Sequence, residues 1–343
     1  MLKYFGILFV ISLTGADSRQ WGFRFDPPAT NDFPIVGVLA QEISLDSADV
    51  FGDDFLLKSI RNHWQSYIAA SYVKFIESQA ARVVPIWIDK PRKYYEKMMK
   101  RVNGVLFPGG NADFINNWGY AQAGRYIYEI ANEMNERGEY FPLWGTCLGF
   151  ELLAYLGANQ TDFRRVCNAE SIALKLNFTQ NFSESRMFRQ APQHIVDILD
   201  SKPVAANFHH FCLTPENFTS SGMDATWTII ATNVDKVGLE FISAMEHKMY
   251  PYYGVQFHPE KNLFEWHKSS TIVHNLDATR SSQYFAEFFV QETRKNKNSF
   301  KTEGEANRFL IYNWPAQFTG KNGSALTQMY FFSLIDTHLK KLD

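Results

Sequence analysis

The 343-residue sequence has few cysteines, almost no net charge and no long apolar run beyond its amino-terminal segment. Three cysteines are too few for a disulfide-built mini-protein. Thirty-four basic and 36 acidic side chains leave a net charge of −2, and this balance disfavours a nucleic-acid-binding protein, which needs a basic face. No later run approaches the ~18 apolar residues of a membrane-spanning helix, so we expect no association with nucleic acid or membrane.

The sequence also lacks the spacings that are typical of metal sites. Its nine histidines form no His-Glu-X-X-His string, and its cysteines form no Cys-X-X-Cys pair. His209 and His210 are adjacent, whereas two ligands on one helix face lie three or four residues apart. We therefore expect neither a metal nor a cofactor.

Short apolar strands alternate with amphipathic helices in the first half of the chain, which is typical of parallel strands joined by crossover helices. The pattern predicts strands at 35–40, 83–88, 105–107 and 140–144 and helices at 67–80, 94–101, 124–137 and 148–156, followed by strands at 226–232, 240–246 and 252–257 and a helix at 283–294. The predicted fold is α/β, with a mostly parallel central sheet and helices on both faces. We expect one domain over 30–295, with 296–343 as a carboxyl-terminal extension packed on it.

The amino-terminal segment predicts entry into the secretory pathway. Lys3 precedes an apolar run over 4–13, and small residues follow up to Ala16, so residues 1–16 have the pattern of a signal peptide. Five Asn-X-Ser/Thr sites are expected to be glycosylated and to lie on the surface, and they begin at Asn159, Asn177, Asn181, Asn217 and Asn322.

An odd number of cysteines in that pathway leaves at least one thiol free. Cys147 lies in Gly-Thr-Cys-Leu-Gly, between a predicted strand and a predicted helix, which is the pattern of a nucleophile elbow. The helix amino terminus that follows would favour a thiolate. Cys167 and Cys212 could pair, but the sequence does not give their separation.

A base for this thiol is expected at the end of the last predicted strand. His258 and Glu260 are two residues apart, so both side chains fall on the same side, and Glu260 could orient the imidazole. An acyl-transfer site also needs donors for an oxyanion. The N–H groups of Gly109 and Gly110, which follow a strand, and of Leu148 are the candidates.

These motifs together resemble the gamma-glutamyl hydrolases, within the class I glutamine amidotransferase-like superfamily. The resemblance covers most of the chain and rests on residues 34–37, 67–74, 81–85, 106–110, 144–151, 207–209 and 253–261. It implies that Cys147 is the nucleophile, His258 the general base and acid, His209 a histidine near the substrate and Glu260 the acid of the triad. Similar amidotransferases carry glutamine where this chain has Glu151, so we expect Glu151 to influence what the pocket accepts.

The resemblance implies hydrolysis of gamma-glutamyl amides through an acyl-enzyme, with the poly-gamma-glutamyl tails of folates as substrates, in lysosomes or outside the cell. Because such tails are polyanionic, basic residues are expected near the pocket, and Lys74, Arg82 and Lys261 are candidates.

Two other functions remain open. One is a glutaminase domain that passes ammonia to a synthetase, and the other is a secreted binding protein on a catalytically silent scaffold. The sequence does not distinguish endo from exo cleavage, and it leaves open whether the chain forms a homodimer.

Overall fold

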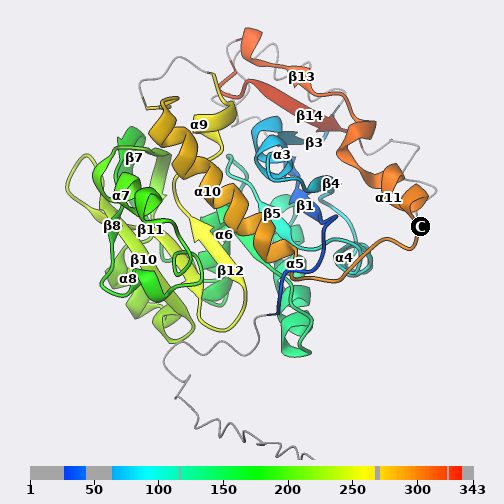
Figure 1. Cartoon of the computed structure of the whole chain (residues 1–343), viewed down its shortest axis with the longest axis horizontal. Coiled ribbons are helices and arrows are strands. Elements are labelled where there is room, and N and C mark those ends of the chain that lie inside the picture. Colours follow the sequence, from blue (N-terminus) through cyan, green and yellow to red (C-terminus); the bar gives the residue numbers. More distant parts are fainter. Residues whose placement is uncertain (1–26, 44–63, 116, 267–270, 323, 334–343) are drawn as a thin grey trace, which may run out of the picture.

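The computed structural model describes residues 27–43, 64–115, 117–266, 271–322 and 324–333 (Figure 1). The predicted signal peptide lies outside the described residues. No helix in the described ranges is both long and apolar enough to cross a membrane.

An eight-stranded sheet forms the centre, in the order β4-β1-β5-β6-β12-β11-β10-β8. The first five of these strands are parallel, and the last three continue the sheet in antiparallel fashion. In chain order they are β1 (Ile35–Leu39), β4 (Arg82–Ile86), β5 (Val105–Phe107), β6 (Leu143–Thr146), β8 (Asn177–Phe178), β10 (Trp227–Val234), β11 (Glu240–His247) and β12 (Tyr252–Val255).

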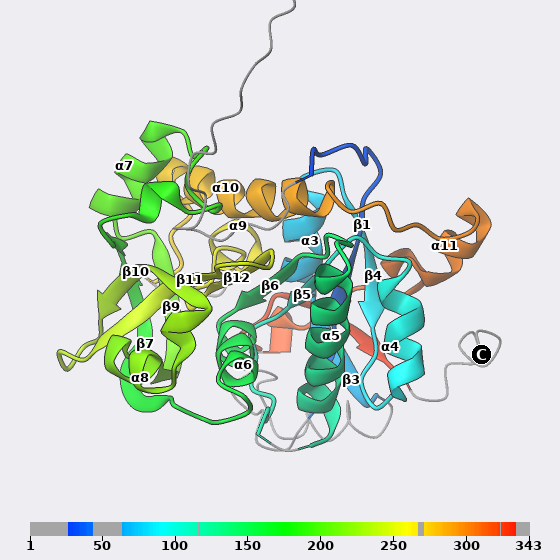
Figure 2. The ribbon, with the colours of Figure 1, turned by 90° about the horizontal axis from the view of Figure 1, so that it is seen from below.

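Helices cover both faces of this sheet, as Figure 2 shows. On one face lie α4 (Arg92–Met99), α5 (Gly119–Glu136) and α6 (Leu148–Gly157), and on the other lie α3 (Ala70–Glu77) and α10 (Leu276–Thr293). Strand β1 is apolar on both sides and therefore needs cover on both faces. Ile35 and Leu39 belong to the core that includes α4, α5 and α6, while Val36 and Val38 belong to the core that includes α3 and α10. The predicted mostly parallel, doubly covered sheet is confirmed.

Two smaller sheets flank the central one. Strands β2 (Gln41–Glu42), β3 (Ser66–Ala69), β14 (Gln328–Phe332) and β13 (Gln317–Phe318) form one antiparallel sheet, and β7 (Arg165–Leu174) pairs with β9 (Ala205–Cys212) in the other. Within the described ranges the other helices are α7 (Gln193–Ser201), α8 (Pro215–Ser220), α9 (Lys261–Phe264) and α11 (Glu303–Phe309), with 3₁₀ turns at Phe182–Glu184, Met223–Ala225, Ile311–Asn313 and Gly320–Asn322.

The structure corrects several predicted element boundaries. The helix predicted over 67–80 begins only at Ala70, because 66–69 form β3 and pair with β14, some 260 residues further along the chain. The strand predicted at 140–144 lies instead at 143–146, and the pair β7–β9 was not predicted. Local periodicity does not show long-range pairing, and that pairing decides these boundaries.

A close backbone approach fixes the start of α6 against β5. A Cβ on Gly149 would lie 2.0 Å from the carbonyl oxygen of Phe107, and one on Gly145 would lie 2.4 Å from the carbonyl oxygen of Gly149. Because these neighbours are backbone atoms, they cannot move aside as a side chain could.

We expect Gly149→Ala to lower the free energy of unfolding by about 1–3 kcal/mol or more, because the added methyl overlaps the backbone of β5. Urea denaturation monitored by circular dichroism measures this loss. Gly304→Ala is the matched control, since it lies in helix α11 with nothing within 4 Å of the added atom. An equal, small effect of both substitutions would contradict the argument.

Candidate active site

Cys147 occupies a strained turn between β6 and α6. Its φ of 50° and ψ of −108° place a non-glycine residue at positive φ, and it is the amino-terminal cap of α6. Its backbone N–H donates to the carbonyl oxygen of Val255 at 2.9 Å, which ties the turn to the neighbouring strand β12. This is the strand-to-helix elbow that the sequence motif predicts.

His258 lies just beyond β12 and is held by Glu260. The two side chains are buried, and His258 Nδ1 lies 2.7 Å from Glu260 Oε1. A Cβ built on Gly109 would lie 2.8 Å from His258 Cε1 and 3.1 Å from Cys147 Cβ, so the imidazole and the thiol face the same small space. With Nδ1–H donating to Glu260, Nε2 carries the lone pair that a base needs.

Burial keeps both members of this pair neutral in the free protein. It raises the pKa of the Cys147 thiol well above its usual value, and the carboxylates of Glu151 and Glu260 act in the same direction. Burial also lowers the pKa of His258, against the opposing effect of Glu260. The expected stabilisation of a thiolate by the helix amino terminus is therefore outweighed by burial and by the two carboxylates.

Tyr72, a residue that the sequence analysis did not select for the site, connects the glycine loop to the histidine. Its buried hydroxyl accepts a 2.8 Å hydrogen bond from the N–H of Gly109 and lies 3.4 Å from His258 Nδ1. Gln41 Nε2 donates to the carbonyl oxygens of Pro108 and Gly109 and so holds the same loop. An oxyanion at Gly109 would therefore have to replace the tyrosine hydroxyl as the partner of this N–H.

A cavity of about 940 Å³ opens at these residues. Its lining includes Cys147, His258, Gly109, Gly110, Leu148, Glu151 and His209, so the structure brings together every predicted catalytic, oxyanion and substrate-binding residue except Glu260, which contacts His258 from behind. Of the three predicted basic residues only Lys261 lines the cavity. Lys74 donates instead to Gln328 Oε1, and Arg82 to the carbonyl oxygen of Phe33.

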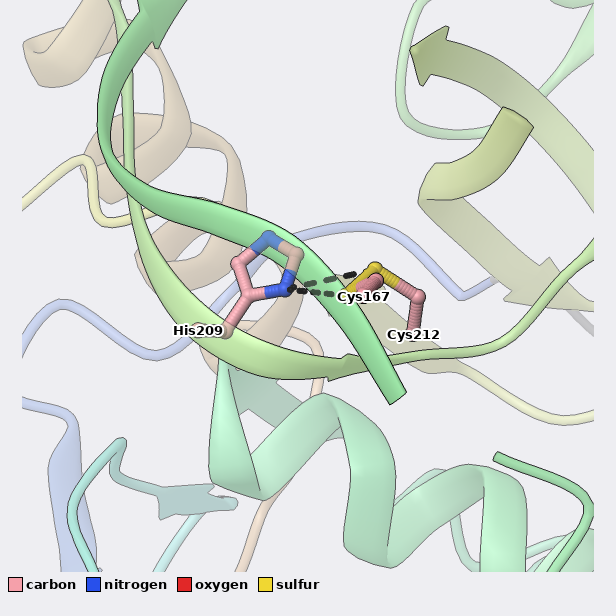
Figure 3. A group of neighbouring side chains, drawn as sticks. All are labelled: Cys167, His209 and Cys212. Carbon is pink, nitrogen blue, oxygen red and sulfur yellow. Dashed lines mark hydrogen bonds between the residues drawn. A yellow bond between two sulfur atoms is a disulfide. The ribbon is translucent and has the colours of Figure 1, made fainter. Parts of the chain in front are cut away.

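His209 is a buried histidine of strand β9 that lies against a disulfide. Cys167 and Cys212 are joined, with Cα atoms 5.9 Å apart, and Cys147 is a free cysteine, as the odd count required. Figure 3 shows His209 Nδ1 directed at both sulfur atoms. Burial lowers the pKa of His209 to about 4, so the ring is neutral near neutral pH.

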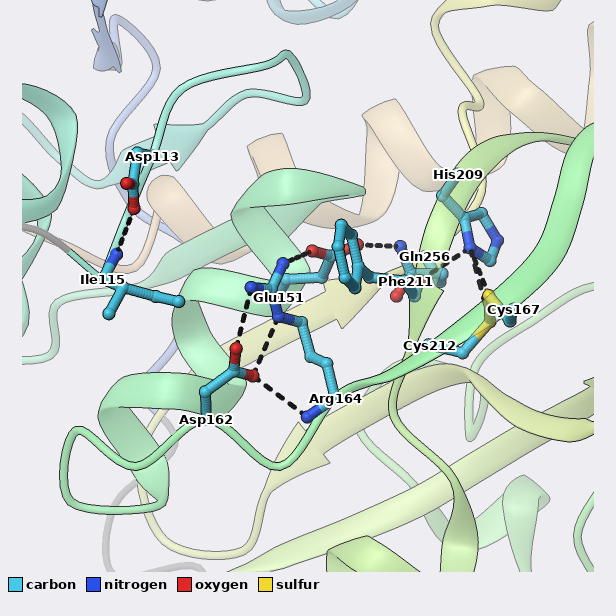
Figure 4. A network of polar contacts seen from close by, with 10 residues as sticks. All are labelled: Asp113, Ile115, Glu151, Asp162, Arg164, Cys167, His209, Phe211, Cys212 and Gln256. Atoms are coloured by element: carbon cyan, nitrogen blue, oxygen red, sulfur yellow. Dashed lines mark hydrogen bonds and ion pairs between the residues drawn. A yellow bond between two sulfur atoms is a disulfide. The ribbon is translucent and has the colours of Figure 1, made fainter.

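Glu151 is bound by Arg164, a residue for which the sequence offered no signal (Figure 4). Arg164 Nη1 donates to Glu151 Oε2 at 2.6 Å, and the same guanidinium binds both oxygens of Asp162. The guanidinium carbon Cζ of Arg164 lies 4.1 Å from the ring centre of Phe114 and 4.6 Å from that of Phe211. Burial raises the pKa of the Glu151 carboxyl, and the ion pair with Arg164 opposes that rise.

The predicted glycosylation sites differ in exposure. Asn159, Asn177 and Asn181 are exposed, whereas Asn217 is half-buried and its amide nitrogen donates to the carbonyl oxygen of Phe163 at 2.6 Å. The fifth sequon, at Asn322, includes a residue outside the described ranges.

Comparison with known proteins defines the class of this site. Residues 34–260 match the Peptidase C26 family model. The chain is 38% identical to the gamma-glutamyl hydrolase of Bos taurus over 95% of its own length and 98% of that protein, and 40% identical to that of Homo sapiens over 87% and 89%. The gamma-glutamyl hydrolase of Rattus norvegicus is 41% identical over 88% and 90%.

The chain therefore belongs to the Peptidase C26 family, which confirms the resemblance to gamma-glutamyl hydrolases and the prediction of a cysteine hydrolase. Among solved structures, a glutamine amidotransferase of Methylobacillus flagellatus is similar at 8% identity, with a TM-score of 0.38, over 80% of this chain and 99% of that one.

We expect Arg164→Leu to lower the free energy of unfolding by about 3–5 kcal/mol, because it leaves the Glu151 carboxylate buried without its cation. Glu151→Gln in the same chain should recover much of this loss, and urea denaturation of the single and double variants measures both effects. Arg137→Leu, which breaks an exposed pair with Glu139, is the control and should cost less than about 1 kcal/mol. Full additivity of the two active-site substitutions would contradict the coupling.

Proposed function

We propose that this chain hydrolyses gamma-glutamyl amide bonds and that poly-gamma-glutamyl folates are its substrate class. The observation that carries the proposal is that Cys147 and His258 line one cavity of about 940 Å³ and that Glu260 contacts His258. The family to which the chain belongs supports the same reaction.

The proposed reaction begins when His258 Nε2 takes the proton of the Cys147 thiol while Nδ1–H donates to Glu260. The sulfur attacks the gamma-carbonyl carbon, and the N–H groups of Leu148 and Gly110 bind the resulting oxyanion, joined by that of Gly109 when it exchanges the Tyr72 hydroxyl for the oxyanion. His258 then protonates the leaving amine, which leaves a thioester at Cys147. Finally, His258 activates a water molecule that hydrolyses the thioester and releases the acid.

The environment of His258 supports activity in mildly acidic solution. Because burial lowers the pKa of His258, the ring stays neutral, and able to accept a proton, at a pH where an exposed histidine is charged. This agrees with our proposal that the protein follows the secretory pathway to the lysosome or the cell exterior. Exposed sequons at Asn159, Asn177 and Asn181 support passage through that pathway.

Two features of the cavity support a poly-gamma-glutamyl folate, which has an aromatic head and an anionic tail, as ligand. Exposed Trp118 and Phe211 lie in its lining, and their rings offer stacking surfaces for an aromatic group. Arg164 and Lys261 supply positive charge. The cavity also contains the acidic residues Glu42, Asp113, Glu151 and Glu170, and burial raises the pKa of Glu42, so we propose that protonation of Glu42 assists the binding of a polyanion.

The decisive experiment compares the wild type with Cys147→Ala on a synthetic poly-gamma-glutamyl folate and on free glutamine. We expect the wild type to shorten the tail and the variant to lose at least about 10³-fold in rate, because the nucleophile is absent. Chromatography of the products measures the loss, and their lengths distinguish endo from exo cleavage. Turnover of glutamine alone would favour a glutaminase, and no turnover of either would favour a binding protein.

The raised pKa of Glu42 predicts that substrate binding depends on pH. Burial raises its pKa to about 7, so the carboxyl is mostly neutral below that pH and becomes a carboxylate above it. Between about pH 6 and about pH 8 we expect the KM of the wild type for a polyglutamyl substrate to rise by about fivefold, since a like charge a few Å away costs on the order of 1 kcal/mol.

Steady-state kinetics of Glu42→Gln test this prediction, because the amide stays neutral and the rise in KM should largely disappear. A gamma-glutamyl substrate with a single carboxylate is the control and should show a smaller change in the wild type. An unchanged rise in the variant would assign the effect to another group.

A further inference from the structure

Cys167, His209 and Cys212 form a cluster that the proposed hydrolysis does not use. His209 Nδ1 lies 3.7 Å from Cys167 Sγ and 3.6 Å from Cys212 Sγ, and the three side chains are between 0% and 7% exposed. They come from two neighbouring strands, since Cys167 belongs to β7 and the other two residues belong to β9 (Figure 3). Two sulfur atoms and one imidazole nitrogen therefore lie within 3.7 Å of one another.

We propose that reduction of the Cys167–Cys212 disulfide converts this cluster into a binding site for a divalent transition-metal ion such as Zn²⁺. The ligands are the two thiolates and Nδ1 of His209. The site lies beside the catalytic pocket and is distinct from Cys147 and His258. The inference does not depend on the proposed hydrolysis.

The separations of the ligand atoms fit a tetrahedral metal. Zinc binds thiolate sulfur at about 2.3 Å and imidazole nitrogen at about 2.0–2.1 Å, so a sulfur and a nitrogen on one ion lie about 3.6 Å apart. Both Sγ–Nδ1 separations already have this length. Only the two sulfur atoms have to move apart, to about 3.8 Å, and reduction of the bond between them permits that movement.

A neighbouring amide is placed to select the tautomer that a metal requires. Asn207 Oδ1 lies 3.2 Å from His209 Nε2, and Asn207 Nδ2 donates to the carbonyl oxygen of Ala205 at 2.9 Å. The second contact fixes the amide with its oxygen toward the ring, so Nε2 carries the hydrogen when a metal occupies Nδ1. The present contact of Nδ1 with the carbonyl oxygen of Phe211, at 2.9 Å, is exchanged for the metal.

The disulfide is converted into a metal site in two steps, reduction and metal binding. A dithiol such as dithiothreitol transfers two electrons and two protons to the disulfide, which gives two protein thiols and one cyclic disulfide of the reagent. The divalent ion then displaces the two thiol protons and binds two thiolates and one neutral imidazole. Three protein ligands leave one tetrahedral position for water. Because His209 lines the pocket, the bound ion would hold this ring in place beside the substrate.

The experiment uses Cys147→Ala as the parent protein, so that Cys167 and Cys212 are its only thiols. The oxidised and the dithiothreitol-reduced forms are freed of reagent without oxygen and titrated with Co²⁺, whose thiolate charge-transfer absorption reports sulfur ligation. We expect one Co²⁺ per chain in the reduced form, displaced by Zn²⁺, and no such absorption in the oxidised form. The readout needs no activity, so a failure of the proposed hydrolysis does not affect it.

Two further variants of this parent locate the ion. Cys167→Ser should abolish the charge-transfer band, and Asn207→Ala should weaken binding by about 10–100-fold while the band remains. Circular dichroism checks that each variant is folded, and the comparison of oxidised with reduced parent stands even if the serine variant is not. No Co²⁺ binding by the reduced parent, or binding unchanged by Cys167→Ser, would overturn the proposal.

Discussion

The strained backbone at Cys147 is the constraint on which the site depends. A positive φ at a cysteine is costly, and it persists because β6, α6 and β12 determine the position of the turn from several sides. Gly145 and Gly149 allow this packing, since neither position has room for a side chain. Cys147, in the same turn, lines the cavity together with His258, so the close packing of α6 against β5 also positions the predicted nucleophile.

Burial and charge compensation determine the chemistry around that turn. Burial raises the pKa of Cys147 and lowers that of His258, and Glu260 lies 2.7 Å from Nδ1 of the histidine, where it can orient the ring. At the cavity wall Arg164 binds Glu151 and opposes the rise that burial causes in its pKa, and the same guanidinium lies over the rings of Phe114 and Phe211. Of the basic residues expected near the pocket Lys261 lines it, and together with Arg164 it lies among the carboxylates of Glu42, Asp113, Glu151 and Glu170, so the lining carries both signs of charge.

Much of the site could be predicted because its residues lie in local motifs. Cys147 lies in a strand-to-helix glycine motif, and His258 and Glu260 are two residues apart, although the turn after β12 rather than strand alternation brings their side chains together. Tyr72 and Arg164 could not be found in this way. Tyr72 reaches the histidine only through the packing of α3, and Arg164 binds a carboxylate on another element, so neither contact leaves a pattern in neighbouring residues.

Hydrophobic period and glycine placement over a few residues are enough to predict the alternation of strands and helices, the turn at Cys147 and the candidate base that follows the last strand. The pairing of Cys167 with Cys212 beside His209, the pairing of β14 with β3 and the cations that line the pocket follow only from the folded structure. These features depend on contacts between residues far apart in the chain, and their energies are set by burial, which a linear pattern does not contain.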